Sequence, residues 1–192
     1  RLEIWIMNVT GAFLFLVTTV FDIYISIVLA RFILQMVRAD FYNPVSQFIV
    51  KATNPLLIPL RKIVPGFGGL DIASLVLFVL IIAVKLGLYV FVFHDPGPVQ
   101  VLPLVIFFIK SMANTIINFF LFVIFVSAIL SWVTAAGGGY NPFADILNQI
   151  AEPVLGPARK IIPPMGGLDI SPMLVMIGLI FVKQLFGLTG MP

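Results

Sequence analysis

The sequence predicts an all-α membrane protein of four transmembrane helices, built as two parallel helix–amphipathic loop–helix repeats. Of its 192 residues, 61% are hydrophobic and only 10% are charged, whereas soluble domains carry about 25% charged residues. Four apolar stretches approach the length of about 20 residues that a bilayer-spanning helix needs. The chain also matches itself without a gap at an offset of 98 residues. The composition indicates the membrane, and the offset indicates a duplicated unit.

The first repeat is assigned to residues 1–95 and the second to residues 96–192. A Pro-Gly-Pro turn at 96–98 separates them. Val99–Ile109 contains Pro103, so it is either a kinked start of the third helix or a separate interfacial segment. The predicted spans are about 11–37 and 72–93 in the first repeat, and about 111–133 and 170–188 in the second.

The internal match is densest in the long loops, at 38–71 and 134–169. Between Tyr42 and Ile72, 15 of 31 positions are identical to those 98 residues later. Two crossings in each unit return the chain to its starting side, so a pseudo-twofold axis along the membrane normal is expected. The two loops hold six Lys and Arg residues. The positive-inside rule therefore places both loops in the cytoplasm and both termini in the periplasm.

Each loop is predicted to hold two short helices in the membrane interface. Asn43 is a good helix N-cap, and Pro44 suits the first helical position. A second element is expected to start at Pro55, capped by Asn54, and at Pro153. The apolar positions of the first element recur at helical spacing in both repeats, at Val45, Phe48, Ile49 and Ala52, and at Phe143, Ile146, Leu147 and Ile150.

Three motifs of the loop are repeated and carry its candidate contact and turn residues. The Tyr-Asn-Pro and Arg-Lys motifs are candidates for contact with a partner or with anionic lipid, although flanking cations commonly serve only to anchor topology. The Gly-Gly-Leu-Asp motif is a candidate ligand turn, but a tight reversal followed by a helix cap explains it as well. The contact candidates are Tyr42, Asn43, Pro44, Arg61, Lys62, Tyr140, Asn141, Pro142, Arg159 and Lys160; the turn and cap candidates are Gly68, Gly69, Asp71, Gly166, Gly167 and Asp169.

Four charges fall inside the predicted spans, where charges are costly and are candidates for function. They are Asp22, Arg31, Lys85 and Lys183. The two lysines occupy equivalent positions and could either snorkel outward or be buried. Asp22 could meet Lys85 between antiparallel neighbours, whereas Arg31 is about 13 Å from Asp22 along one helix and cannot pair with it.

The residue inventory offers no recognisable active site. The chain has no Cys and one His, so thiolate and histidine metal centres lack their ligands. The sequence contains no catalytic triad, carboxylate pair or phosphate loop. We therefore expect no enzyme, no bound cofactor or metal, and no nucleic-acid partner. Membrane lipids, another membrane protein or a second copy of the chain are the expected partners.

The loop motifs resemble those of the YggT family, also called YlmG, of bacterial inner-membrane proteins. The second copy resembles the second repeat of its proteobacterial members. The resemblance implies a multi-pass protein of the bacterial inner membrane. The matching segments are Leu34-Gln35, Arg38–Pro44, Asn54-Pro55, Pro59–Pro65 and Gly68–Asp71, and then Ser131-Trp132, Tyr140–Pro142 and Gly166–Asp169.

The resemblance also implies several functions. Plastid and cyanobacterial relatives are associated with haem attachment to cytochrome b6 and with organelle or cell division, and proteobacterial members with osmotic stress and potassium uptake. Our preferred interpretation is a non-enzymatic accessory or assembly factor that binds a membrane complex through its amphipathic loops. The alternatives are a component of a small-ion transporter or channel and a lipid-binding, membrane-organising protein in cell division.

Overall fold

The structure is a computed structural model that describes the backbone of residues 2–66, 69–93, 100–135, 137–161 and 169–188. Side chains are described for 9–66, 69–91, 100–134, 137–161 and 169–188. Within these ranges every regular element is a helix, and turns or irregular segments join the helices. The elements are α1 (Leu2–Met36), α2 (Pro44–Arg61), α3 (Ile72–Leu88), the π-helix η1 (Tyr89–Phe93), α4 (Val101–Ala135), α5 (Pro142–Ile161) and α6 (Ser171–Leu185).

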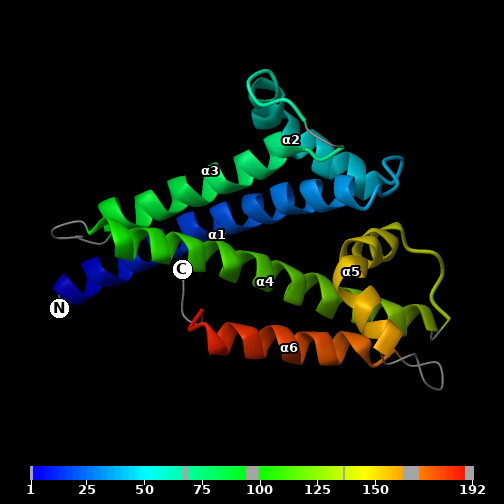
Figure 1. Ribbon diagram of the computed structural model, residues 1–192. Helices are drawn as coiled ribbons and strands as arrows, with labels where there is room; N and C mark the ends of the chain where they lie inside the picture. Colours follow the sequence, from blue (N-terminus) through cyan, green and yellow to red (C-terminus); the bar gives the residue numbers. More distant parts are fainter. Residues whose placement is uncertain (1, 67–68, 94–99, 136, 162–168, 189–192) are drawn as a thin grey trace.

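The two repeats are built alike. α1 packs against α3 in the first, and α4 packs against α6 in the second. The shorter helices α2 and α5 lie at the same end of the molecule and contact each other (Figure 1). This shared end agrees with the predicted parallel arrangement. The symmetry is incomplete, because α4 also packs against α1 and α3 and so lies between the first repeat and α6.

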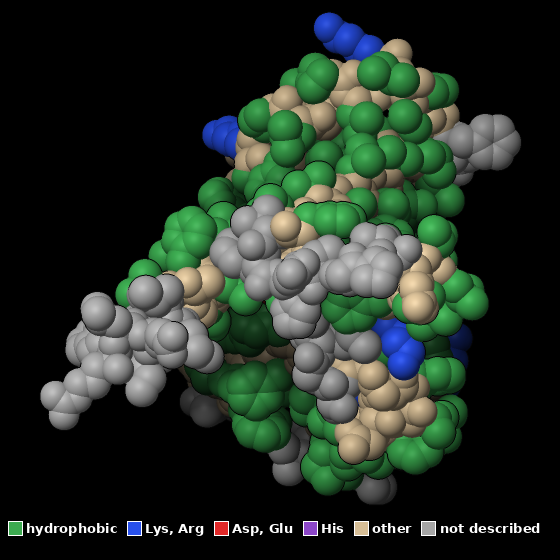
Figure 2. Space-filling model, turned by 90° about the vertical axis from the view of Figure 1, so that its left-hand side faces the viewer, with side chains coloured by type: hydrophobic (Ala, Val, Ile, Leu, Met, Phe, Trp, Pro, Cys, Tyr) green, Lys and Arg blue, Asp and Glu red, His purple; other side chains and the backbone are tan. Residues whose placement is uncertain are grey.

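Three helices are long and apolar enough to cross a membrane, which indicates an integral membrane protein. The apolar segments are Val9–Met36, Ile72–Phe91, which runs from α3 into η1, and Val101–Thr134; in each of them an apolar stretch of 18 residues is only 17%, 39% and 22% buried, respectively. Most of their apolar side chains therefore face outward, where lipid would cover them. In the view of Figure 2, from the side away from α5, most of the described side chains are hydrophobic.

The fourth predicted span is shorter than expected. α6 has 15 residues, which at 1.5 Å per residue is about 22 Å, less than the hydrocarbon core of about 30 Å. The sequence prediction of four spans is therefore confirmed for three helices. The crossing by α6 stays a prediction, as does the cytoplasmic side of the loops.

The segment ahead of the third span belongs to α4. Val101–Ile109 continues without a break into the rest of that helix. Pro103 is tolerated because it lies in the first turn, where backbone N–H groups have no helical partner. This settles the alternative that the sequence left open, in favour of one long helix.

The prediction of two short helices in each loop is wrong, because α2 and α5 each run as one helix through two prolines. Pro55 and Pro59 are four residues apart and therefore lie on one face of α2, which is exposed. The backbone hydrogen bonds that the two prolines remove lie on this exposed face. On the other face, Thr53 and Leu57 are buried. The helix therefore bends (Figure 1) but continues, and Asn54 lies inside it rather than capping it. Pro153 and Pro157 lie likewise in α5.

The apolar stripes of α2 and α5 are turned mainly toward the spanning helices. Ile49 and Leu57 of α2 are buried, as are Ile146, Leu147 and Ile150 of α5. Together with side chains of α1, α3 and α4 they form one hydrophobic core. The two loop helices thus close one end of the bundle, although Phe48 and Phe143 of the same stripes stay 61% and 43% exposed.

Candidate functional site

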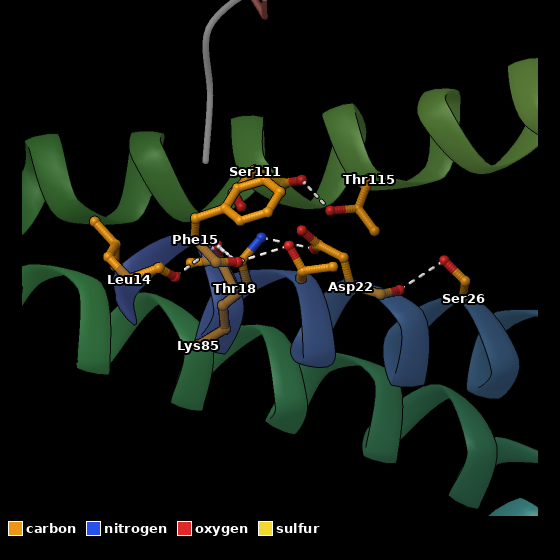
Figure 3. Close-up of polar contacts among 9 residues, drawn as sticks. Leu14, Phe15, Thr18, Asp22, Ser26, Lys85, Ser111 and Thr115 are labelled. Carbon is orange, nitrogen blue, oxygen red and sulfur yellow. Dashed lines mark hydrogen bonds and ion pairs between the residues drawn. The ribbon is translucent and has the colours of Figure 1, made fainter. Parts of the chain in front are cut away.

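An ion pair links α1 and α3 near the middle of the molecule. Lys85 Nζ donates to Asp22 Oδ1 over 2.7 Å. Figure 3 shows Lys85 reaching from α3 past α1 toward Asp22, on the side where α4 carries Thr115. The Lys85 side chain is 6% exposed and that of Asp22 is 50% exposed. The predicted meeting of these two residues is confirmed, and Lys85 is buried rather than snorkelling outward.

The equivalent lysine of the second repeat has a different partner. Lys183 Nζ donates to Asn118 Oδ1 over 2.6 Å, joining α6 to α4. An amide thus replaces the carboxylate, and it comes from a position two residues before Phe120, the residue equivalent to Asp22. Sequence comparison at strict repeat spacing missed this pair, although a lysine repeated inside a span needs an oxygen acceptor on the neighbouring helix.

A cavity of about 650 Å³ lies beside the Asp22–Lys85 pair, between α1 and α4. α2 and α5 close it at the loop end through Ile49, Ile146 and Leu147. Asp22, Ser26, Asn114 and Asn118 line this cavity, and Ser127 lines a smaller one beside α5 and α6. The polar residues of its lining are Thr19, Asp22, Ser26, Lys85, Asn114, Thr115 and Asn118.

The hydroxyl groups on the cavity wall already donate their protons to backbone carbonyls. Thr19 Oγ1 donates to the carbonyl of Phe15 (2.6 Å), Ser26 Oγ to that of Asp22 (2.7 Å) and Thr115 Oγ1 to that of Ser111 (2.9 Å). Asn114 is 5% exposed, and its Oδ1 is buried without a hydrogen-bond partner. The hydroxyl groups of the wall therefore offer the cavity only lone pairs, while the amides of Asn114 and Asn118 carry both donors and an acceptor.

The first loop ends in an ion pair that begins α3. Arg61 donates to Asp71 Oδ2, which also accepts from Ser74 Oγ over 2.5 Å. Asp71 Oδ1 accepts from the Ser74 N–H over 3.4 Å, so Asp71 caps α3 as predicted. Burial alone would raise the pKa of Asp71, but the hydrogen bonds from Arg61 and Ser74 and the charge of Arg61 hold it below its usual value.

The second loop repeats this pair. Arg159 Nε donates to Asp169 Oδ2 over 2.9 Å, and its Nη1 lies 2.6 Å from Glu152 Oε2. Asp169 Oδ1 accepts from the Ser171 N–H over 2.9 Å at the start of α6. Burial would raise the pKa of Asp169, but Arg159 and Ser171 lower it. Both arginines of the Arg-Lys motifs are thus held by carboxylates, which the spacing of ten residues in both repeats could have suggested.

Lys62 and Lys160, the second members of the Arg-Lys motifs, are exposed. Gly69 has φ +83°, a left-handed conformation that favours glycine and supports the predicted turn. Gly68, Gly166 and Gly167 lie outside the described residues.

Arg31, one of the four charges inside the predicted spans, is buried and incompletely hydrogen-bonded. It is 7% exposed, and its Nε and Nη1 are buried with no partner. Its guanidinium carbon lies 6.0 Å from the centre of the Phe41 ring, at the outer limit of a cation–π contact. Position 129, its equivalent in the second repeat, holds Ile. This cation is therefore a feature of one repeat only.

The two loops meet where α2 and α5 begin. Asn43 Oδ1 accepts from the Val45 N–H over 2.9 Å and so caps α2, as predicted. Asn43 Nδ2 donates to the carbonyl of Pro142 over 2.8 Å, which joins the two repeats. Asn141 accepts from the Phe143 N–H over 2.9 Å at the start of α5. Beside these caps, Tyr42 and Tyr140 are 89% and 81% exposed.

Among the described residues, no three His, Cys, Asp or Glu side chains come together in a way that could hold a metal ion. The polar groups of the cavity are amides, hydroxyls and one compensated ion pair. Such groups can recognise a ligand by hydrogen bonds.

Comparison with known proteins places the chain in a family. The family model described as CCB3/YggT matches twice, at residues 10–92 and 104–189, one match in each repeat. No solved structure matches the chain. Over 191 residues the chain is 46% identical to an uncharacterized protein of Pseudomonas aeruginosa, covering 97% of this chain and 96% of that protein.

Other relatives are similar over the whole chain or over part of it. The uncharacterized protein YggT of Escherichia coli is 37% identical over 171 residues, which cover 88% of this chain and 86% of YggT. The uncharacterized protein ycf19 of Porphyra purpurea is 38% identical over 80 residues, which are 40% of this chain and 80% of ycf19. That match has about the length of a single repeat. The chain is thus a two-repeat member of the CCB3/YggT family.

Proposed function

We propose that the chain is a non-enzymatic membrane accessory protein that binds another membrane protein at the end formed by α2 and α5. The observation that carries this proposal is that the same large side chains are exposed there in both repeats. Tyr42 and Tyr140 are 89% and 81% exposed, and Ile63 and Ile161 are 79% and 80% exposed. Exposed apolar and aromatic groups in a repeated arrangement favour a contact surface.

The two loops can act as one surface because they are tied together. Asn43 donates to the carbonyl of Pro142, and the Asp40 N–H donates to Gln149 Oε1 over 3.3 Å. Lys51, Lys62 and Lys160 add exposed cations to this end. By the positive-inside rule it faces the cytoplasm of a bacterial inner membrane.

Photo-crosslinking in native membranes tests the proposal. A photoreactive residue replaces Tyr42, Tyr140 or, as a control, Phe181, which is 64% exposed on α6. The proposal requires the same protein adduct from Tyr42 and Tyr140 and its absence from Phe181. Lipid adducts alone at both tyrosine positions would show that these side chains only anchor the loops in the headgroup region.

Ion transport is the second candidate, and the polar cavity lining favours it. The carboxylate of Asp22 is, however, already compensated by Lys85, so a cation would meet no free negative charge there. Ion flux in liposomes that is unchanged by Asp22→Asn and by Lys85→Met would reject this candidate.

A further inference from the structure

The cavity between α1 and α4 combines a polar wall at mid-depth with an apolar remainder. Asp22 lies 13 residues from one end and 14 from the other of the segment Val9–Met36. We propose that this cavity binds a single-chain lipid with an uncharged, hydroxyl-bearing head, such as a monoacylglycerol. This goes beyond the proposed function and uses a different part of the molecule from the exposed tyrosines.

The hydroxyl oxygens of the wall and the unpartnered Asn114 Oδ1 favour a ligand that donates hydrogen bonds. The hydroxyl protons of Thr19, Ser26 and Thr115 are taken by backbone carbonyls of their own helices. Asn114 Oδ1 is buried and accepts nothing. A buried acceptor left without a partner is costly. A ligand hydroxyl at Asn114 would satisfy it, and the other wall oxygens can accept further donors.

The charges at the cavity favour an uncharged head. Asp22 and Lys85 compensate each other at 2.7 Å. Lys183 stands behind Asn118, to which it donates, so a cationic head would meet an additional positive charge. A phosphate or ammonium head is also costly to bring to the middle of a bilayer, whereas an uncharged hydroxyl group is much less so.

The shape of the cavity favours a small molecule over a helix. Phe48, Ile23 and Phe122 line it and are 61%, 57% and 62% exposed, so it opens toward the lipid-facing surface. α2 and α5 close its loop end. A spanning helix is about 30 Å long and 10 Å wide and needs several times the 650 Å³ present. That volume lies within the usual range of about 300–1,000 Å³ for small-molecule sites.

Native mass spectrometry of the protein released from phosphatidylcholine nanodiscs tests the inference. The probes share one acyl chain and differ in the head: 1-monooleoylglycerol, methyl oleate without a donor, oleic acid and oleylamine. We expect saturable binding of one monooleoylglycerol per chain. The other three probes should bind about tenfold more weakly, since each lacks the matching donor or adds a charge.

Two substitutions and one matched control locate the site. Asn114→Leu removes the unpartnered acceptor at similar volume and should weaken monooleoylglycerol binding about tenfold. Thr115→Val, at the wall, should also weaken it. Thr134→Val is the control, because Thr134 makes the same 2.9 Å bond to a backbone carbonyl of α4 but does not line the cavity.

Binding that is equal for methyl oleate, or unaffected by both wall substitutions, would overturn the inference. Preference for oleic acid would overturn it too, and would indicate that the lysines dominate recognition. Exclusive occupancy by water, with no probe retained, would have the same consequence. Each of these results leaves the crosslinking test at Tyr42 unaffected, so the two proposals can fail separately.

Discussion

Lys85 Nζ and Asp22 Oδ1 lie 2.7 Å apart and join α3 to α1 near the middle of the bundle. The two side chains are unequally covered, because that of Lys85 is 6% exposed and that of Asp22 is 50% exposed. In the second repeat Lys183 meets the amide of Asn118. A lysine bonded to an oxygen on the first helix of its repeat is thus common to both, whereas the negative charge belongs to one.

Substituting the two members of this pair should have unequal effects on stability. Asp22→Asn leaves the charge of Lys85 buried without a carboxylate and should lower the free energy of unfolding by about 3 kcal/mol. Lys85→Met leaves Asp22, which is half-exposed to the cavity, and should cost less, about 1 kcal/mol. Thermal unfolding in one detergent measures both.

The double variant Asp22→Asn/Lys85→Met is the control for this pair. It removes both charges together, so it should be more stable than Asp22→Asn alone. If the two single effects simply add in the double variant, the ion pair contributes nothing and the unequal burial has no consequence.

Acid should weaken the ion pairs at the ends of the two loops, where Asp71 meets Arg61 and Asp169 meets Arg159. The folded-state pKa of each carboxyl is lowered from an unfolded value of about 3.9. Their stabilising contribution is therefore complete above about pH 4 and is lost as the pH falls through the lower folded value. Asp71→Asn should flatten the decline of unfolding free energy between about pH 4 and pH 2. A decline that is unchanged in Asp71→Asn and in Asp169→Asn would contradict this.

The sequence predicted what depends on local patterns and on the repeat. The helix cap at Asn43, the cap at Asp71 and the pairing of Asp22 with Lys85 all follow from residue type and spacing, and the structure contains them. The repeat also placed α2 and α5 at one end of the molecule.

What the sequence did not predict depends on tertiary context. Because proline lacks a backbone N–H, the sequence predicted a helix break at Pro55. Pro55 lies on the exposed face, however, and the packing of the buried face keeps α2 continuous. The partner of Lys183 was missed because Asn118 lies two residues away from the repeat-equivalent position. The cavity could not be foreseen, because it results from the way α4 packs against α1 while α2 and α5 close one end.

Replacing Arg31 should stabilise the protein. Its Nε and Nη1 are buried without partners, and an apolar side chain of similar length would remove that cost. We expect Arg31→Met to raise the free energy of unfolding by about 1–3 kcal/mol. Lys51→Met, which removes an exposed cation of α2, serves as the control and should change stability by less than about 0.5 kcal/mol. A loss of stability in Arg31→Met would instead reveal an anionic partner for this side chain.

The asparagines that begin α2 and α5 should differ in importance although they are repeat equivalents. Both side chains accept a backbone N–H at the start of their helix, over 2.9 Å in each case. Only Asn43 is buried, at 4% exposed, and its Nδ2 also donates to the carbonyl of Pro142 in the other repeat. Asn141→Ala should therefore cost about 1 kcal/mol for the lost cap. Asn43→Ala should cost about 2 kcal/mol, because it also leaves the partly buried Pro142 carbonyl without its donor. Thermal unfolding of the two variants in the same detergent compares these costs directly.

The variant Asn43→Asp separates the capping role of Asn43 from its contact with the other repeat. The aspartate keeps the cap but cannot donate to Pro142, and it turns a buried carboxylate oxygen toward that carbonyl, so its cost should be at least the difference between the two alanine variants. Equal costs for Asn43→Ala and Asn141→Ala would mean that the contact between the repeats does not contribute to stability.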